Sequence, residues 1–193
     1  MITHLQGRLV EKNPTEVVIE CNGVGYEVQI SLNTFSKLPD QENIKLLTHL
    51  QIREDAHILY GFLTPLEREI FQMLISVSGV GTGTARTMLS SLTPEQVREA
   101  ISSEDVATIQ SVKGIGAKTA QRVILDLRDK ILKAYDIADS VTGISNTNKE
   151  EALSALETLG FARKAAEKVC DAIVKDQPDA SVEDLIKLAL KKL

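Results

Sequence analysis

The sequence predicts a multidomain α+β protein with an N-terminal OB-type β-barrel, a central all-α domain and a C-terminal three-helix bundle. Three observations predict this architecture. Short β-branched runs separated by turn residues fill the first sixty positions, apolar residues at helical spacing follow from residue 64, and a polar stretch interrupts that helical pattern before residue 149. We therefore expect domains over residues 1–62, 63–134 and 149–193, with a flexible linker over residues 135–148.

The first domain is predicted as β because its apolar residues alternate or cluster in short runs between turn signals. Asn13-Pro14 and Asn22-Gly23 are such turn signals. The expected strands are Gly7–Val10, Glu16–Glu20, Val24–Ile30, Ile44–Gln51 and His57–Phe62. Five or six strands in this length are typical of a small Greek-key barrel.

Helices are expected from Thr64 onward. Thr64-Pro65-x-Glu67 offers an N-cap, a proline at the first helical position and the returning carboxylate of a capping box. Thr93-Pro94-x-Gln96 repeats the pattern. Five helices are predicted between Leu66 and Leu132.

The polar stretch from Asp136 to Thr147 contains few large apolar residues and is predicted as the linker. Three short helices should follow it, the first closed by Gly160, the second ended before Pro178 and the third capped by Ser181. The expected core residues of this bundle are Leu153, Leu156, Val169, Ile173, Leu185 and Leu188.

A glycine-led phrase occurs twice in the central domain. Gly79-Val80-Gly81-Thr82-Gly83-Thr84-Ala85 is followed thirty-five residues later by Gly114-Ile115-Gly116-Ala117-Lys118-Thr119-Ala120. When the copies are extended to Leu92 and Leu127, five of the 14 aligned positions are identical. Each copy lies between two helical patterns, so the unit is predicted as helix, tight turn, helix.

Such a turn places backbone N–H groups at a helix N-terminus, where the helix dipole favours anions and glycine lets a phosphate approach closely. A single Gly-x-Gly is more often a helix cap and turn than a ligand site. The duplication favours a phosphate site, and the second copy adds Lys118 and Thr119, with Arg122 one turn on. Two copies predict that the protein binds phosphates of both strands of a nucleic-acid duplex. The predicted contacts are Gly79, Gly81, Gly114, Gly116 and these three side chains.

The charge distribution agrees with this prediction although the chain is acidic overall, with a net charge of −5. Residues 63–134 carry nine basic and eight acidic side chains, a net charge of +1, whereas each of the other three segments is negative. A local patch can bind DNA while the remaining acidic surface limits indiscriminate binding.

Composition excludes several other classes. Aromatic residues make up 4% of the chain and Trp is absent, which argues against binding single strands by base stacking. No P-loop, catalytic triad or metal-ligand spacing is found, so we expect no cofactor and no ATPase activity. Cys21 and Cys170 suggest free thiols in a reducing cytoplasm, and no signal peptide or membrane span is predicted.

The two glycine-led repeats resemble the tandem helix-hairpin-helix motifs of the RuvA family, the Holliday-junction-binding subunits of the bacterial RuvAB branch-migration complex. The resemblance extends over the whole chain. The phrases similar to the family are Gly7-Arg8, Gly23-Val24-Gly25-Tyr26-Glu27-Val28, Arg53-Glu54-Asp55-Ala56, Leu59-Tyr60-Gly61-Phe62 and Leu156-x-x-Leu159-Gly160-Phe161.

The resemblance implies a non-catalytic homotetramer that holds a four-way DNA junction open and square, with an octamer of two tetramers as a further arrangement. Glu54 and Asp55 match the family's acidic pin at the junction centre. The hairpin residues match its phosphate contacts, except that the family often has Lys where this chain has Gly83. A UBA-like C-terminal bundle would bind the hexameric RuvB ATPase, with Leu156, Leu159, Leu185 and Leu188 as partner-facing candidates. RuvC resolvase is a further implied partner, in recombination and DNA repair.

Two alternatives remain open at this point. Helix-hairpin-helix DNA glycosylases carry a Lys in a similar phrase and an Asp eighteen residues later, a spacing that Lys118 and Asp136 share. A general duplex-binding scaffold of a nuclease complex would also use the hairpins, but without preferring junctions.

Overall fold

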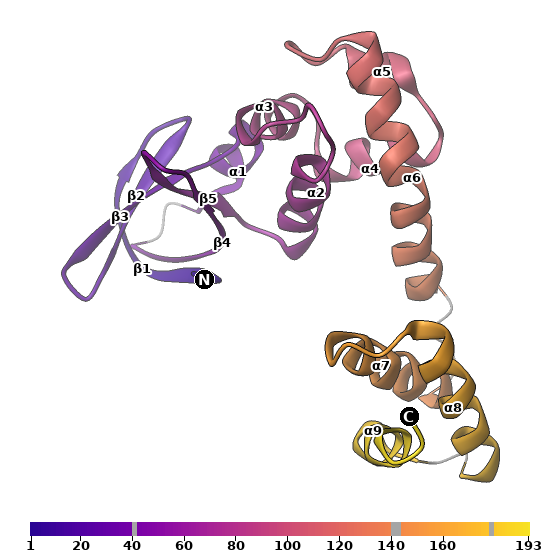
Figure 1. Ribbon diagram of the computed structural model, residues 1–193. Helices are drawn as coiled ribbons and strands as arrows, with labels where there is room; N and C mark the ends of the chain where they lie inside the picture. Colours follow the sequence, from indigo (N-terminus) through magenta and orange to yellow (C-terminus); the bar gives the residue numbers. More distant parts are fainter. Residues whose placement is uncertain (40–41, 140–143, 178–179) are drawn as a thin grey trace. The chain divides into compact units, whose positions relative to one another are not determined.

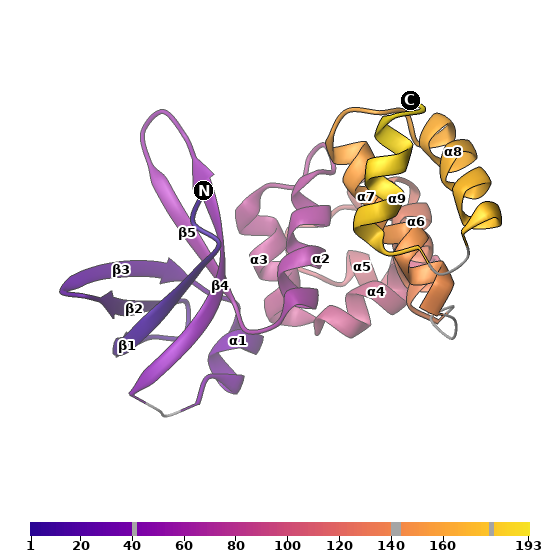
Figure 2. The ribbon, with the colours of Figure 1, turned by 90° about the horizontal axis from the view of Figure 1, so that it is seen from below.

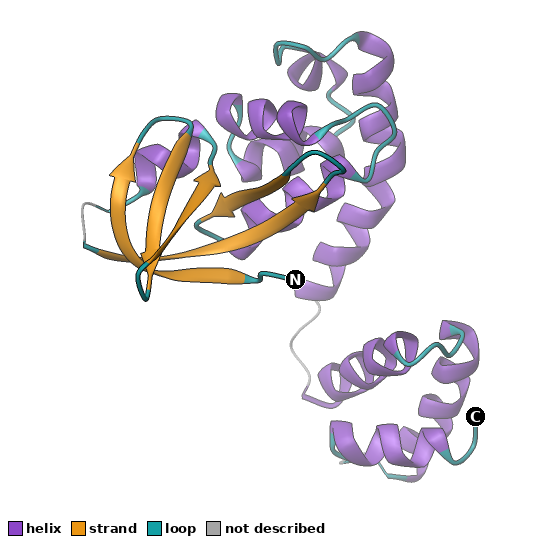
Figure 3. Ribbon diagram, turned by 60° about the vertical axis from the view of Figure 1, so that its left-hand side comes forward, coloured by secondary structure: helices purple, strands orange, loops and turns teal. Residues whose placement is uncertain are grey.

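The computed structural model describes residues 1–39, 42–139, 144–177 and 180–193, and the side chains of these except 133–147. The chain forms two compact units, Met1–Leu132 and Lys133–Leu193, which are described separately (Figure 1). All strands lie in the first unit, and the described part of the second is helical (Figure 3). This confirms the predicted α+β class.

The first unit begins with a closed five-stranded barrel. Its strands are β1 (His4–Lys12), β2 (Glu16–Cys21), β3 (Val24–Gln29), β4 (Asn43–Ile52) and β5 (His57–Phe62). They close in the order β1-β2-β3-β5-β4, with β3 and β5 parallel and the other pairs antiparallel. Each predicted strand is present, which confirms the barrel.

Two local features explain why these residues form a barrel. Asn22 and Gly23 have φ angles of 51° and 84°, the left-handed pair that turns β2 tightly into β3. Gly7 lies so close to β2 that a Cβ atom there would stand 2.1 Å from the Glu20 carbonyl oxygen. The core is formed by Leu5, Val17, Ile19, Val28, Ile30, Leu38, Ile44, Leu46 and Leu59.

A short helix that the sequence analysis did not predict, α1 (Leu32–Lys37), connects β3 to β4. Ser31 caps it by accepting a hydrogen bond from the Thr34 amide. Both side chains are buried, which is unusual for hydroxyl groups unless they have partners.

The five helices expected between Leu66 and Leu132 are all present. They are α2 (Pro65–Ile75), α3 (Thr82–Ser91), α4 (Pro94–Ser102), α5 (Val106–Gln110) and α6 (Ala117–Asp139). Thr93 and Gln96 form the predicted capping box at the start of α4, with both reciprocal hydrogen bonds made.

The other predicted capping box, Thr64-Pro65-x-Glu67, does not form. Thr64 accepts a hydrogen bond from the Glu67 amide as expected, but the Glu67 carboxylate does not return to Thr64. It accepts hydrogen bonds from Ser31 Oγ at 2.7 Å, Thr34 Oγ1 at 2.6 Å and the Leu63 amide at 3.2 Å. The carboxylate is buried and satisfies the two hydroxyl groups of α1, so Glu67 joins α2 to the barrel instead of capping its own helix.

Helix α3 is hydrogen-bonded to the barrel and α1 along its whole length, and Figures 1 and 2 place α1 beside it. At its start, Tyr60 Oη donates to Thr82 Oγ1 at 2.9 Å. At its middle, Arg86 donates to Gln29 Oε1 at 2.6 Å. At its end, Asn33 Nδ2 donates to the carbonyl oxygens of Leu89 and Leu92. The first glycine turn is therefore fixed to the barrel by polar bonds as well as by packing.

The second unit contains α7 (Ile144–Thr158), α8 (Arg163–Asp176) and α9 (Val182–Leu190). Its core is Ala152, Leu153, Leu156, Ala166, Cys170, Ile173, Leu185 and Ala189. Gly160, at a φ angle of 96°, turns the chain after α7, and Ser181 caps α9 as predicted.

Helices α6 and α7 extend into the two ends of the predicted linker, residues 135–148. The backbone is helical to Asp139 and again from Ile144, so helices occupy both ends of that range. Ser, Asn and Asp have low helix propensity but are tolerated near helix ends, so composition alone did not predict how far the two helices extend. Residues 140–143 lie outside the described residues. No helix in the described part of the chain is long and apolar enough to span a membrane.

Candidate nucleic-acid interface

The two glycine turns have the same backbone geometry. Gly79 and Gly114 have φ angles of 93° and 91°, a conformation that side-chain-bearing residues rarely adopt. One residue further on, the Val80 amide donates to the Val77 carbonyl and the Ile115 amide to the Val112 carbonyl, at 3.0 and 3.1 Å. These four apolar side chains are buried and anchor each turn under the helices that flank it.

Each turn ends at an open helix N-terminus. Gly81 is the N-cap of α3, and no side chain caps that end, while Gly116 immediately precedes α6. A Cβ atom added at Gly81, Gly83 or Gly116 would meet no atom within 4 Å. Because internal packing does not require glycine there, the open space is available to a ligand. A helix N-terminus favours an anion in that position.

The second turn carries the basic side chains. Lys118 and Arg122 are exposed and Thr119 is half-buried, all in the first turns of α6. Arg122 Nη1 also donates to the Ser78 carbonyl oxygen at 3.4 Å, so its side chain connects the second hairpin to the first. The structure thus brings together the residues predicted around Gly114 with the turn around Gly79.

Sequence reasoning missed Lys113, an exposed lysine immediately before Gly114. The signal was available, because the thirty-five-residue offset aligns Lys113 with Ser78 of the first copy. Lys113 and Lys118 therefore flank the second turn, and neither has a counterpart at the matching positions of the first, Ser78 and Gly83.

The first turn is organised differently. Thr82, the first residue of α3, is buried, and its Oγ1 accepts hydrogen bonds from Tyr60 Oη and from Arg53 Nη2, the second at 3.5 Å. Arg53 belongs to the β4–β5 turn, which was predicted as part of the acidic pin. This contact places the pin turn beside the first hairpin.

Glu54 and Asp55, the predicted pin residues, are both exposed at that turn. The turn is closed by the Arg53 amide, which donates to the Ala56 carbonyl oxygen at 2.8 Å. Two carboxylates at the tip of a hairpin are usually only solvated. Here the turn that carries them contacts the first hairpin through the Arg53 side chain.

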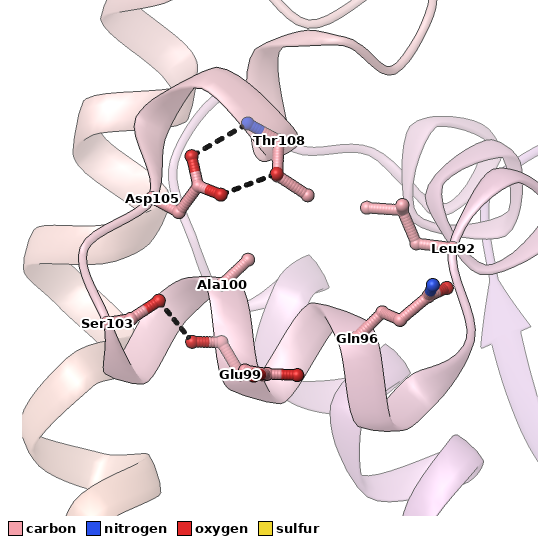
Figure 4. A pocket seen from close by; sticks show the side chains of 7 residues that line it. All are labelled: Leu92, Gln96, Glu99, Ala100, Ser103, Asp105 and Thr108. Atoms are coloured by element: carbon pink, nitrogen blue, oxygen red, sulfur yellow. Dashed lines mark hydrogen bonds between the residues drawn. The ribbon is translucent and has the colours of Figure 1, made fainter.

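A hollow of about 230 Å³ lies between α4 and α5 (Figure 4). It is lined by Leu92, Gln96, Glu99, Ala100, Ser103, Asp105 and Thr108. Asp105 accepts hydrogen bonds from the Thr108 hydroxyl and amide, and these bonds lower the pKa of its carboxyl group. Two carboxylates and no basic side chain line this hollow, so it is not suited to phosphate.

The geometry weighs against the glycosylase alternative. Lys118 and Asp136 both belong to α6, eighteen residues apart, which separates their backbones by about 27 Å along the helix axis. They cannot act together on one base. The Asp136 side chain lies outside the described residues, and no group of three metal-ligating side chains occurs in the described part of the chain.

In the C-terminal unit, the partner-facing prediction is wrong for two of its four residues. Leu156 and Leu185 are almost completely buried, because three short helices need them to fill the core. Leu159 is 59% exposed, and Leu188 is half-buried at the edge of the core.

Three family models match the chain: the RuvA N terminal domain over residues 1–61, the SAM-like helix-hairpin-helix tandem over residues 71–129 and the RuvA C-terminal domain over residues 147–193. The chain is 66% identical to a protein of Christiangramia forsetii and 63% identical to one of Flavobacterium psychrophilum, in each case over 193 residues and the full length of both chains. It is 49% identical to a full-length protein of Bacteroides thetaiotaomicron. All three relatives are named Holliday junction branch migration complex subunit RuvA.

Proposed function

This chain belongs to the RuvA family, and we propose that it binds four-way DNA junctions as the non-catalytic DNA-binding subunit of a branch-migration complex. The observation that carries the proposal is the pair of open helix N-termini at Gly81 and Gly116, which no internal packing explains. Such sites hold phosphate through backbone N–H groups, so recognition would follow the shape of the DNA backbone and not its sequence.

The hairpins would hold the phosphates of the junction arms. In this proposal the contacts are made by Gly79, Gly81, Gly114, Gly116, Lys118, Thr119 and Arg122, and Lys113 adds a further cation beside the second turn. The first turn depends more on backbone N–H groups, because it has Gly83 where the second has Lys118.

The pin would provide the preference for junctions. A homotetramer brings four copies of Glu54 and Asp55 to the crossing, two carboxylates from each subunit. Repulsion between these carboxylates and phosphates disfavours a continuous duplex across the centre and favours strands that separate between arms. A homotetramer, or an octamer of two tetramers, is part of this proposal.

ATP hydrolysis would come from the partner RuvB. We propose that residues 1–62 form the barrel with the pin and tetramer contacts, 63–134 the DNA-binding hairpins, 135–148 the linker and 149–193 the motor-binding bundle. Leu159 is the best-supported contact for the motor, since its side chain is exposed. RuvC would act on the same junction, in the cytoplasm.

The first test is a gel-shift titration with a synthetic four-way junction and a linear duplex of equal length. We expect a preference for the junction of at least two orders of magnitude, about 2.7 kcal/mol. Equal affinities would instead support the general duplex-binding scaffold. Light scattering of the complex measures whether four subunits bind one junction.

The pin is tested by the variant Glu54→Gln/Asp55→Asn. It should lose most of the preference for the junction while its affinity for duplex stays equal or rises. A matched control is Glu11→Gln/Glu27→Gln, which neutralises two exposed carboxylates of the same barrel outside the pin turn. If the pin variant keeps the full preference, the role assigned to Glu54 and Asp55 is wrong.

Motor binding is tested with Leu159→Glu, which changes an exposed side chain and should leave junction binding intact. We expect it to lose stimulation of RuvB ATPase activity on junction DNA. Thr158→Glu, the exposed neighbour, is the control for added charge. Normal stimulation by the Leu159 variant would remove that residue from the motor interface.

A further inference from the structure

We propose that Arg53, from the pin turn of the barrel, supplies the first hairpin with the phosphate-binding cation that its own turn lacks. The inference rests on the proposed function and concerns how this particular chain completes its first DNA contact. The two hairpins differ in charge. The second carries Lys118 within its own helix, whereas the first has Gly83 at the matching position.

The contact that carries the inference is the one between Arg53 and Thr82. Arg53 Nη2 donates to Thr82 Oγ1 at 3.5 Å, and Thr82 is the first residue of α3, directly after the N-cap Gly81. Thr82 is itself held by Tyr60 Oη at 2.9 Å. A guanidinium group from the barrel therefore lies at the helix N-terminus where a phosphate is expected.

The guanidinium group remains available to a ligand. Arg53 is exposed, and no ion pair joins it to a carboxylate among the residues that the structure describes. Its contact with Thr82 uses one of five N–H donors, so the planar group retains donors for a phosphate. A Cβ atom added at the nearby Gly83 would meet no atom within 4 Å, so the space beside this residue is open.

This arrangement changes what the pin turn does. Arg53 would bind a phosphate beside the first hairpin, while Glu54 and Asp55, the next two residues, would repel phosphates from the centre. Attraction and repulsion thus come from three consecutive residues of one turn. The turn would fix where along each arm the duplex ends and the separated strands begin.

The experiment measures junction affinity as a function of salt concentration for Arg53→Gln, Arg53→Lys and Arg53→Gln/Gly83→Lys. Arg53→Gln removes the charge and also the contact with Thr82, because the shorter Gln side chain does not reach an oxygen that Arg53 Nη2 approaches only to 3.5 Å. We expect its affinity to fall about tenfold, and the slope of log affinity against log salt to decrease by about 0.9 for each phosphate that is no longer neutralised. Arg53→Lys should retain most of the affinity.

The double variant is the decisive arm. Lys at position 83 would occupy open space in the first turn of α3, as Lys118 does in α6, and should restore both the affinity and the salt slope of Arg53→Gln. Arg8→Gln, which removes an exposed arginine paired with Glu20 in the same barrel, is the control for net charge and should bind like the unaltered protein.

The proposal is overturned if Arg53→Gln binds with unchanged affinity and slope. It is also overturned if Arg53→Gln weakens binding and Gly83→Lys restores neither quantity, because Arg53 would then act by holding the turn in place. Failure of the proposed function gives a different result, since the unaltered protein itself would then show no preference for the junction over the duplex.

Discussion

Replacing Glu67 with Ala should destabilise the first unit more than any change at an exposed position of the same helix. The carboxylate is 4% exposed and accepts hydrogen bonds from Ser31, Thr34 and the Leu63 amide. Hydrogen bonds to a charged group contribute about 1.5–3 kcal/mol each. The two hydroxyl groups already lie 3.2 Å apart and can satisfy one another in part. The free energy of unfolding should therefore fall by the equivalent of two hydrogen bonds. Because the variant no longer pays to bury a charged group, the expected net loss is about 3–5 kcal/mol.

Urea unfolding at fixed protein concentration, followed by circular dichroism, measures this loss, and hydrogen exchange in α1 and α2 locates it in the first unit. Glu69→Ala, an exposed residue of α2, is the control and should change the free energy of unfolding by no more than about 0.5 kcal/mol. The free energy of unfolding of Glu67→Gln should lie between those of the two Ala variants. Its side-chain oxygen can still accept from the two hydroxyl groups, but its NH2 group would face the Leu63 N–H, and two donors cannot form a hydrogen bond. If the free energies of unfolding of Glu67→Ala and the control differ by less than about 1 kcal/mol, the three hydrogen bonds do not stabilise the contact between the barrel and the helices.

Three further predictions concern the hairpins and the thiols. Lys118→Ala should weaken binding to every form of DNA and lower the salt slope by about 0.9 for each phosphate left without its cation; an unchanged slope would remove Lys118 from the phosphate site. Gly114→Ala should reduce stability by about 1–2 kcal/mol, and junction affinity with it, because of its positive φ angle, while Gly83→Ala, in open space at an ordinary φ angle, should affect stability little. Equal unfolding midpoints for the two variants would contradict this. Cys21 should react with iodoacetamide before Cys170, since burial shields the Cys170 thiol and raises its pKa; mass spectrometry of the labelled peptides measures the order.

Local sequence signals predicted the repeating elements of this fold well. The alternation of β-branched residues identified each strand, and the Thr93 capping box defined the start of α4 because all its partners lie within four residues. The duplicated glycine phrase predicted two turns that have closely similar φ angles. These features depend on neighbours in the chain, which a sequence displays directly.

The features that the sequence did not reveal depend on distant partners. Glu67 matched a capping box, but two buried hydroxyl groups more than thirty residues earlier are its actual partners. In the sequence, Leu156 and Leu185 were candidates both for the core and for a partner-binding surface. The packing of the three helices places both in the core. Arg53 lies in the Arg53-Glu54-Asp55-Ala56 phrase, of which the sequence analysis used only the two carboxylates. Its contact with Thr82 depends on the packing of the barrel against α3, which the sequence does not display.

The hydrogen bonds between α1 and the helices also have a consequence for the order in which the chain acquires its structure during synthesis. The last strand of the barrel ends at Phe62, but Ser31 and Thr34 gain their acceptor only with Glu67, and Asn33 finds its carbonyl partners only at Leu89 and Leu92. At ribosomal rates of about 5–20 residues per second, the thirty residues after Phe62 take roughly 2–6 s to synthesise. During that interval the nascent barrel would carry polar groups on α1 without their final partners, and the emergence of α3 would complete the contacts of the barrel with the first glycine turn.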